Sequence, residues 1–89
     1  MKTTVTEKDV LENMEDVVSF PTTSFNKPIT HVVVRMKNGF TLQEASTCVD
    51  PNNYSEDIGR EICLEKIKDK VWFLLGYQLQ EDIYRSNSK

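Results

Sequence analysis

The chain has few of the residues from which catalytic and metal sites are usually built. It contains one histidine and two cysteines among 89 residues, whereas a metal site usually needs several convergent ligands. It has only three glycines, and it contains neither a glycine-rich phosphate loop nor a Gly-x-Ser-x-Gly motif. We therefore expect no metal, no cofactor and no enzymatic activity.

Long apolar runs and concentrated positive charge are also missing. No apolar run approaches the ~20 residues that span a bilayer. The first ten residues, MKTTVTEKDV, lack the apolar segment of a secretory signal. The net charge is −3, and the 11 lysines and arginines are scattered. Because nucleic-acid binding depends on concentrated positive charge, we expect no nucleic-acid partner. Because the chain lacks a spanning run and a secretory signal, we expect no membrane contact and a cytosolic location.

A single domain of residues 1–89 is expected from the length, with residues 1–5 and 81–89 frayed. Thr6 can cap a first helix over Glu7–Val18, in which apolar residues recur at helical spacing. Pro21 ends that helix, because the residue before a proline avoids the helical region. Residues 21–28 then read as a polar linker, with Phe25 as a possible anchor to the core.

A β-hairpin is the clearest local prediction. The β-branched run Thr30–Met36 and the segment Phe40–Thr47 flank the hairpin signal Asn38-Gly39. A three-residue loop with Gly39 in a left-handed conformation pairs Val34 with Leu42 and puts the apolar residues on one face. A two-residue turn would set charged residues opposite apolar ones. We therefore predict the three-residue loop.

A long helix follows the hairpin. Residues 50–53 read as a turn, and either Asn53 or Ser55 can cap a helix over Tyr54–Leu75 that stops at Gly76. After Gly76 the pattern fits either a short third strand or more helix. The expected fold class is α+β: an N-terminal helix, a β-hairpin that could extend to a three-stranded antiparallel sheet, and one long C-terminal helix packed on it.

Two apolar stripes run along this helix when its residues are placed at 100° intervals. The main stripe contains Cys63, which we read as a small buried side chain. The second stripe, roughly opposite, consists of Ile58, Ile62 and Phe73. Because a helix lying on a small sheet needs only one stripe, we predict that the second contacts another subunit in a homo-oligomer. Gly59 is costly inside a helix, so we expect another backbone element to approach it closely.

The start of this helix offers a candidate ligand site. Arg60 projects within the angular range of the main stripe, close to the helix N-terminus, and Asn53 and Tyr54 precede it. Together with Lys66, these residues could bind an anionic ligand that carries a ring. The simpler alternative is that the sheet ends there and Arg60 reaches water.

Several short segments together resemble a known family. They are KNGF (37–40), CVDP (48–51), Asn53-Tyr54, Ile58-Gly59-Arg60, Glu65-Lys66, Trp72 and LGY (75–77). Their combination is similar to the phage protein family named for gene 49 of a coliphage and gene 66 of a Shigella phage. The resemblance covers nearly the whole chain and implies a phage or prophage source. Phe73 stands where that pattern often has proline, which lets the helix run further.

The resemblance also implies a biological setting. Small phage accessory proteins often act on the host, including its defence systems. The hypothesis that follows is a non-enzymatic accessory protein in the host bacterial cytoplasm. It would antagonise host defence by sequestering a small anionic signal, such as a cyclic nucleotide, in an oligomer. The alternatives are a protein-binding inhibitor of a host defence enzyme or nuclease, and a structural assembly accessory.

Overall fold

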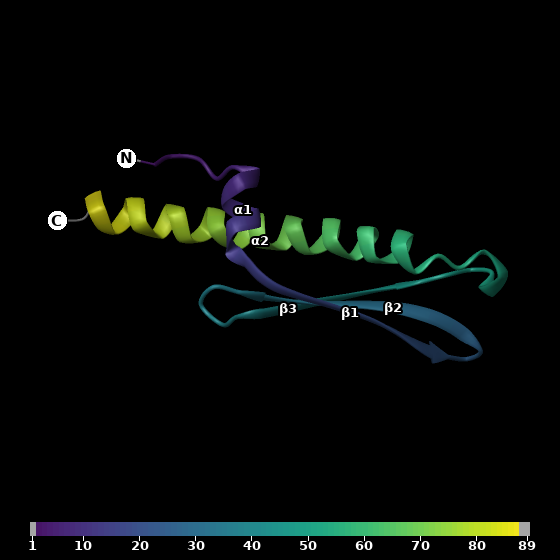
Figure 1. The fold of residues 1–89 in the computed structure, drawn as a ribbon. Coiled ribbons are helices and arrows are strands. Elements are labelled where there is room, and N and C mark those ends of the chain that lie inside the picture. The colour runs from purple at the N-terminus through teal and green to yellow at the C-terminus, as the bar shows by residue number, and fades with distance from the viewer. Residues whose placement is uncertain (1, 88–89) are drawn as a thin grey trace.

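The computed structural model describes residues 2–87. The elements follow the order α1 (Glu7–Asn13), β1 (Met14–Ser24), β2 (Lys27–Met36), β3 (Thr41–Thr47), the 3₁₀ turn η1 (Pro51–Asn53) and α2 (Glu56–Asn87). The strands form one antiparallel sheet in the order β1-β2-β3. Figure 1 shows both helices on the same side of this sheet. The predicted α+β class, with an N-terminal helix, three strands and a long C-terminal helix, is confirmed.

The β2–β3 hairpin has the predicted register. Val34 pairs with Leu42. The backbone N–H of Met36 donates to the carbonyl of Phe40 at 2.8 Å, which closes a three-residue loop. Gly39 has a φ of +91°, a conformation that glycine adopts without the steric cost of a side chain. The pairing puts Val32, Val34 and Met36 on the face that the helices cover, and all three are buried.

The third strand comes from an unexpected part of the chain. We predicted a helix through Val18 and a linker over residues 21–28, but α1 ends at Asn13 and β1 takes up Met14–Ser24. Phe25 and Asn26 form the turn to β2 with φ of 52° and 61°. Two successive positive φ values are typical of a tight hairpin turn. Phe25 is 98% exposed, so it does not anchor the core.

The long helix starts close to the predicted residue but ends much later. Its first turn is capped by Ser55, whose hydroxyl accepts the backbone N–H of Ile58 at 3.3 Å. We predicted a stop at Gly76, but the helix continues through it to Asn87. Residues 77–79 are therefore helical and form no strand. Gly76 has no positive φ, so it does not act as a helix stop. The predicted fraying of the ends falls partly on residues 1 and 88–89, which lie outside the described residues.

The core lies between α2 and the sheet and is closed by α1. Its fully buried side chains come from all three parts: Val10, Val32, Val34, Cys63, Ile67 and Val71. The predicted burial of Cys63 is confirmed. Burying apolar area of this kind is the main favourable term in folding. The sheet therefore holds α2 through one stripe, as a helix on a small sheet requires.

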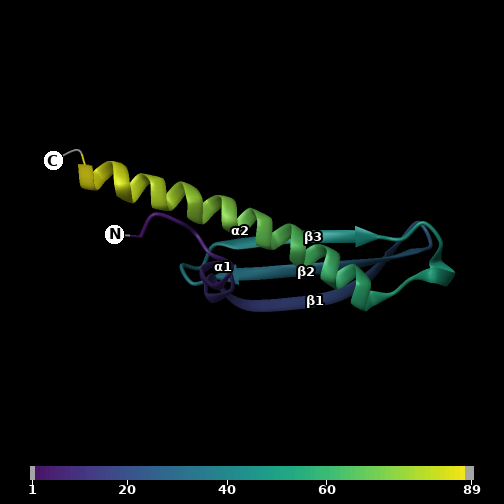
Figure 2. The same cartoon turned by 90° about the horizontal axis from the view of Figure 1, so that it is seen from above.

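The helix α2 is longer than the sheet that it covers. Its 32 residues extend about 48 Å, whereas the 11 residues of β1, the longest strand, extend about 37 Å. Figure 2 shows α2 crossing the sheet diagonally and projecting beyond the β2–β3 turn. The whole fold measures 59 × 20 × 19 Å. Within residues 2–87, neither helix combines the length and apolar composition that a membrane span requires.

The N-terminal segment lies beside the projecting half of α2. In α1, the Thr6 hydroxyl accepts the backbone N–H of Asp9, and the Asp9 carboxylate accepts that of Thr6 at 2.9 Å. Lys2 also contacts the Asp9 carboxylate at 2.6 Å. The hydrogen bond from Lys2, together with those that Thr6 makes, lowers the pKa of Asp9 to about 2. Lys2, Val5, Asp9 and Leu79 line a shallow groove of about 220 Å³ along this half of the helix.

Candidate functional site

The residues before α2 are held by hydrogen bonds to the turn and to the sheet. The side-chain amide of Asn53 donates to Asp50 Oδ2 at 3.4 Å and is exposed to solvent. Tyr54 is half-buried, and its hydroxyl oxygen lies 2.5 Å from Oγ1 of Thr30, a fully buried residue of β2. The Tyr54 hydroxyl therefore anchors this segment to the sheet, while the Asn53 side chain stays accessible.

Gly59 explains why α2 can come so close to β2. A Cβ atom at this position would lie 2.7 Å from Thr30 Oγ1 and 3.0 Å from Thr30 Cβ. Side chains do not normally approach so closely, so glycine is required for this contact. We predicted that another backbone element approaches Gly59; the close neighbour is instead the side chain of Thr30 in β2. Tyr54 and Gly59 together fix the start of α2 over Thr30.

The predicted ligand residues do not all gather in one place. Arg60 follows Gly59 and is exposed, and it forms no ion pair with any other residue between 2 and 87. Lys66 lies six residues further along the same helix. Six helical residues correspond to about 9 Å along the axis and about 120° around it. Asn53, Tyr54 and Arg60 therefore share one end of α2, and Lys66 lies on another flank.

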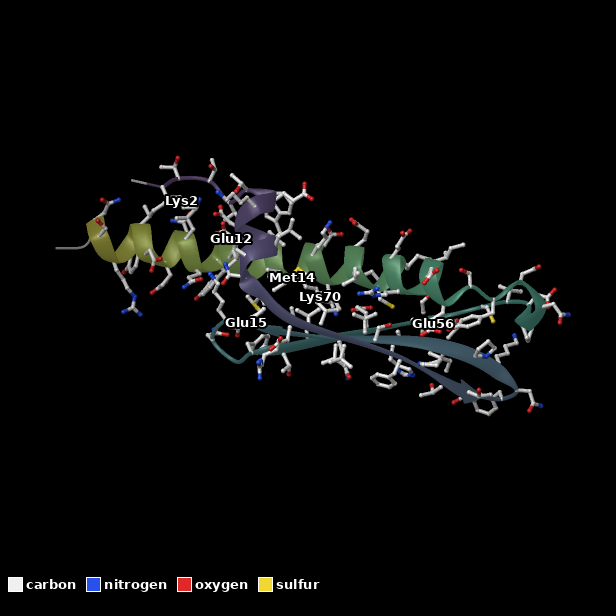
Figure 3. The ribbon with its side chains drawn as sticks, in the orientation of Figure 1. Lys2, Glu12, Met14, Glu15, Glu56 and Lys70 are labelled. Atoms are coloured by element: carbon white, nitrogen blue, oxygen red, sulfur yellow. The ribbon has the colours of Figure 1, made fainter. Side chains whose placement is uncertain are left out.

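Carboxylates also surround this end of the helix. Glu56 and Asp57 occupy the first turn of α2, and Figure 3 shows Glu56 at the end of the molecule where the helix begins. Asp50 accepts the backbone N–H of Asn52 at 3.0 Å, as a cap of η1. Acidic groups suit the positive end of a helix dipole, but they also repel an anionic ligand. Among these acidic residues, Arg60 is the only positively charged side chain between residues 50 and 60.

The middle of α2 is tied to the sheet by an ion pair. Lys70 points from α2 toward the sheet (Figure 3) and pairs with Glu44 of β3. The hydrogen bond from Lys70, with smaller contributions from the charges of Lys70 and Lys66, lowers the pKa of Glu44. Lys66 is thus close enough to β3 to act on Glu44, but its own side chain remains exposed and forms no ion pair with any described residue.

The second stripe of α2 is exposed. Ile58, Ile62 and Phe73 are 60%, 43% and 78% exposed. Tyr77, one turn after Phe73, is 70% exposed and continues the same stripe. The predicted stripe lacks Tyr77 because the predicted helix stops at Gly76. Within residues 2–87 no element covers this face, so the apolar side chains that we assigned to an oligomer contact are available for one.

The far face of the sheet is a second uncovered surface. It was missed because β1 was read as helix and linker. Phe20 of β1 stacks on His31 of β2, with ring centroids 5.0 Å apart, and Thr22 Oγ1 lies 2.7 Å from His31 Nε2. Val18 is 58% exposed on the same face. The sole histidine is therefore engaged in a surface cluster of an aromatic and a hydroxyl group.

The two cysteines differ in burial, since Cys63 is buried and Cys48 is partly buried. Both cysteines are free thiols, and desolvation raises the pKa of Cys63. A buried thiol with a raised pKa is a poor nucleophile. Among residues 2–87, no three histidine, cysteine, aspartate or glutamate side chains are placed to hold one metal ion.

The chain was also compared with known proteins. The family model described as phage protein (N4 Gp49/phage Sf6 gene 66) family matches residues 3–83. No curated protein and no solved structure matches the chain.

Proposed function

Because the chain belongs to the phage protein (N4 Gp49/phage Sf6 gene 66) family, we propose that it is a non-enzymatic phage accessory protein that antagonises host defence. It acts in the host bacterial cytoplasm as an oligomer, and it sequesters a small anionic signal of the cyclic-nucleotide class. The protein removes the signal by binding it and does not chemically change it.

The observation that carries this proposal is the position of Arg60. Its guanidinium is exposed at the end of α2 where Asn53 and Tyr54 also lie, and it has no ion-pair partner among residues 2–87. A guanidinium can bind a phosphate through two parallel hydrogen bonds. The neighbouring Glu56 and Asp57 oppose an anion, so the site needs further positive charge. In an oligomer, another subunit would supply that charge.

Binding is tested by isothermal titration calorimetry with a panel of cyclic mono-, di- and trinucleotides. We expect one member of the panel to bind, and Arg60→Ala to weaken that binding at least tenfold, because each phosphate contact of an arginine contributes on the order of 1.5–3 kcal/mol. Lys37→Gln is the matched control, since Lys37 is exposed in the β2–β3 turn, far from Arg60. Absence of binding to every member of the panel at millimolar concentration would contradict the proposal.

A host protein is the second candidate for what this chain binds. The uncovered sheet face with exposed Val18 and stacked Phe20 favours it, because apolar side chains gathered on a sheet surface are typical of a protein contact. In this version the chain caps a host defence enzyme or nuclease. The calorimetric panel separates the two versions, since an enzyme inhibitor of this kind leaves all the nucleotides unbound.

A further inference from the structure

Along the exposed side of α2, apolar and charged residues follow in the same order whether they are read from the start or from the end of the helix. Six residues on this side form what we call the outer stripe: Ile58, Ile62, Lys66, Asp69, Phe73 and Tyr77. At 100° per residue they lie within a sector of about 100°, and all six are exposed. Read from either end, the stripe has two apolar or aromatic positions, then a charged one. The two central charges, however, are opposite in sign.

A palindrome of this kind is what a two-fold axis requires. In a symmetric dimer, the same patch on each copy meets its own reverse. When two α2 helices run antiparallel with the axis between residues 67 and 68, residue i meets residue 135 − i of the second copy. Ile58 then faces Tyr77 of the second copy, Ile62 faces Phe73, and Lys66 faces Asp69. Each of these contacts occurs twice.

From this match we propose that the outer stripe binds a second copy of this chain, with the two α2 helices antiparallel and Lys66 of each paired with Asp69 of the other. Neither Lys66 nor Asp69 has an ion-pair partner among residues 2–87. In the dimer, each of these two side chains gains an ion-pair partner from the second copy. Opposite charges at the centre specify the register, and apolar pairs on both sides bury surface.

The surroundings of the stripe leave room for a second helix. Asp69 and Phe73 line a shallow groove of about 360 Å³ between α2 and β3, together with Phe40, Leu42, Lys70 and Leu74. Phe40 is itself 53% exposed. Helices pack with their axes 8–10 Å apart, so a second α2 along the stripe also covers part of this groove. Gly76 borders the stripe and, like the groove, is open to solvent.

This inference rests on the oligomer of the proposed function, to which it assigns an interface, but it requires no ligand. In the dimer, Lys66 is engaged by Asp69 of the second copy, so any nucleotide site is left with Asn53, Tyr54 and Arg60. Association is therefore measured without nucleotide. A dimer that binds no nucleotide would contradict nucleotide sequestration and leave the interface standing. A monomer that binds nucleotide would contradict the interface and the oligomer, and leave nucleotide sequestration standing.

The test is charge reversal with rescue, read by sedimentation equilibrium. We expect the wild-type chain to be dimeric at micromolar concentration. Lys66→Asp creates two Asp–Asp contacts across the axis and Asp69→Lys creates two Lys–Lys contacts, so each should weaken dimerisation at least tenfold, about 1.4 kcal/mol. The double variant Lys66→Asp/Asp69→Lys restores opposite charges in both pairs and should dimerise like the wild type.

Two further variants separate the stripe from general effects on the helix. Phe73→Ala should weaken dimerisation with little change in far-ultraviolet circular dichroism, because Phe73 is 78% exposed in the monomer. Glu61→Lys, a charge reversal on α2 outside the outer stripe, should leave dimerisation unchanged. A wild-type monomer at 100 micromolar would overturn the proposal. A dimer in which the single reversals have no effect, or the double variant does not recover, would overturn it as well.

Discussion

The two halves of α2 contain one glycine each, and the two glycines have opposite surroundings. Gly59 is buried, and an added Cβ would collide with Thr30 of β2. Gly76 is exposed, and an added Cβ would meet nothing within 4 Å. The same residue type is therefore required by packing in the first half of the helix. In the second half, no contact among residues 2–87 requires it.

The comparison extends to what each half contacts. The first half lies over the sheet and is held by Gly59, Cys63 and Ile67 against β2, with Tyr54 bonded to Thr30. The second half still contacts the β2–β3 hairpin at Leu74 and Leu75, and its last turns project beyond the sheet beside the N-terminal segment (Figure 1). The stability of these last turns depends on local helix formation and on surface contacts, which contribute less than burial in a core.

The largest effect is expected at Gly59. Gly59→Ala should reduce the free energy of unfolding by about 1–2 kcal/mol, because the cost of overpacking exceeds the gain in helix propensity. Urea unfolding followed by circular dichroism measures this. Glu61→Ala, at an exposed site two residues further along the helix, is the control and should change little. A variant more stable than the wild type would contradict the close contact with Thr30.

At Gly76 we expect the free energy of unfolding to change in the opposite direction. Gly76→Ala should raise the free energy of unfolding by up to about 1 kcal/mol, since alanine is the better helix former and, apart from the adjoining helix backbone, the new methyl group has no atom of residues 2–87 within 4 Å. The same urea titration compares it with Gly59→Ala. A loss of stability would mean that something outside the single chain approaches Gly76. A second copy that packs beside the outer stripe is one such neighbour.

A smaller effect is expected from the contact between the N-terminal segment and α1. The pKa of Asp9 is about 2 in the folded chain, below its ordinary value of 3.8. A lowered pKa adds stability above pH 3.8, and that stability is lost as the pH falls toward 2. Lys2→Ala should therefore make unfolding less pH-dependent over this range. The change should be small because the pair lies at the surface.

Thermal melts at pH 5, 3 and 2 measure this pH dependence. Lys37→Ala serves as the control for loss of one exposed lysine. Glu44, whose pKa is lowered by Lys70, provides a background slope of the same sign in both variants. If Lys2→Ala and the wild type lose stability in parallel between pH 5 and pH 2, the Lys2–Asp9 contact does not contribute in solution.

The features that were predicted correctly are those for which the local sequence allows only one favourable arrangement. Asn38-Gly39 between alternating apolar residues allows one register that buries a common face, and that register is observed. Thr6 followed by Asp9 forms a reciprocal cap that depends on four residues only. Gly59 inside a helix costs free energy, which correctly indicated a close neighbour. These features require no knowledge of distant parts of the chain.

The errors occurred where distant contacts override local preference. Val17 and Val18 fit a helical repeat, but in the fold they pair with Val34 and Val33 of β2. The turn at Phe25 and Asn26 has no Asn-Gly signal, so its two positive φ values follow from the pairing of β1 with β2. Gly76 has the sequence of a helix stop, yet the helix continues because good helix-forming residues follow it.

Some features of the candidate sites likewise follow from the local sequence, and others depend on distant contacts. From the sequence by itself, the second stripe of α2, the buried Cys63 and the position of Arg60 near the helix start could be derived, because helical periodicity determines which residues share a side. Only the tertiary structure extended the stripe to Tyr77 and exposed the sheet face around Phe20. Those properties depend on which surfaces the sheet and α1 cover, and coverage is a property of the whole fold.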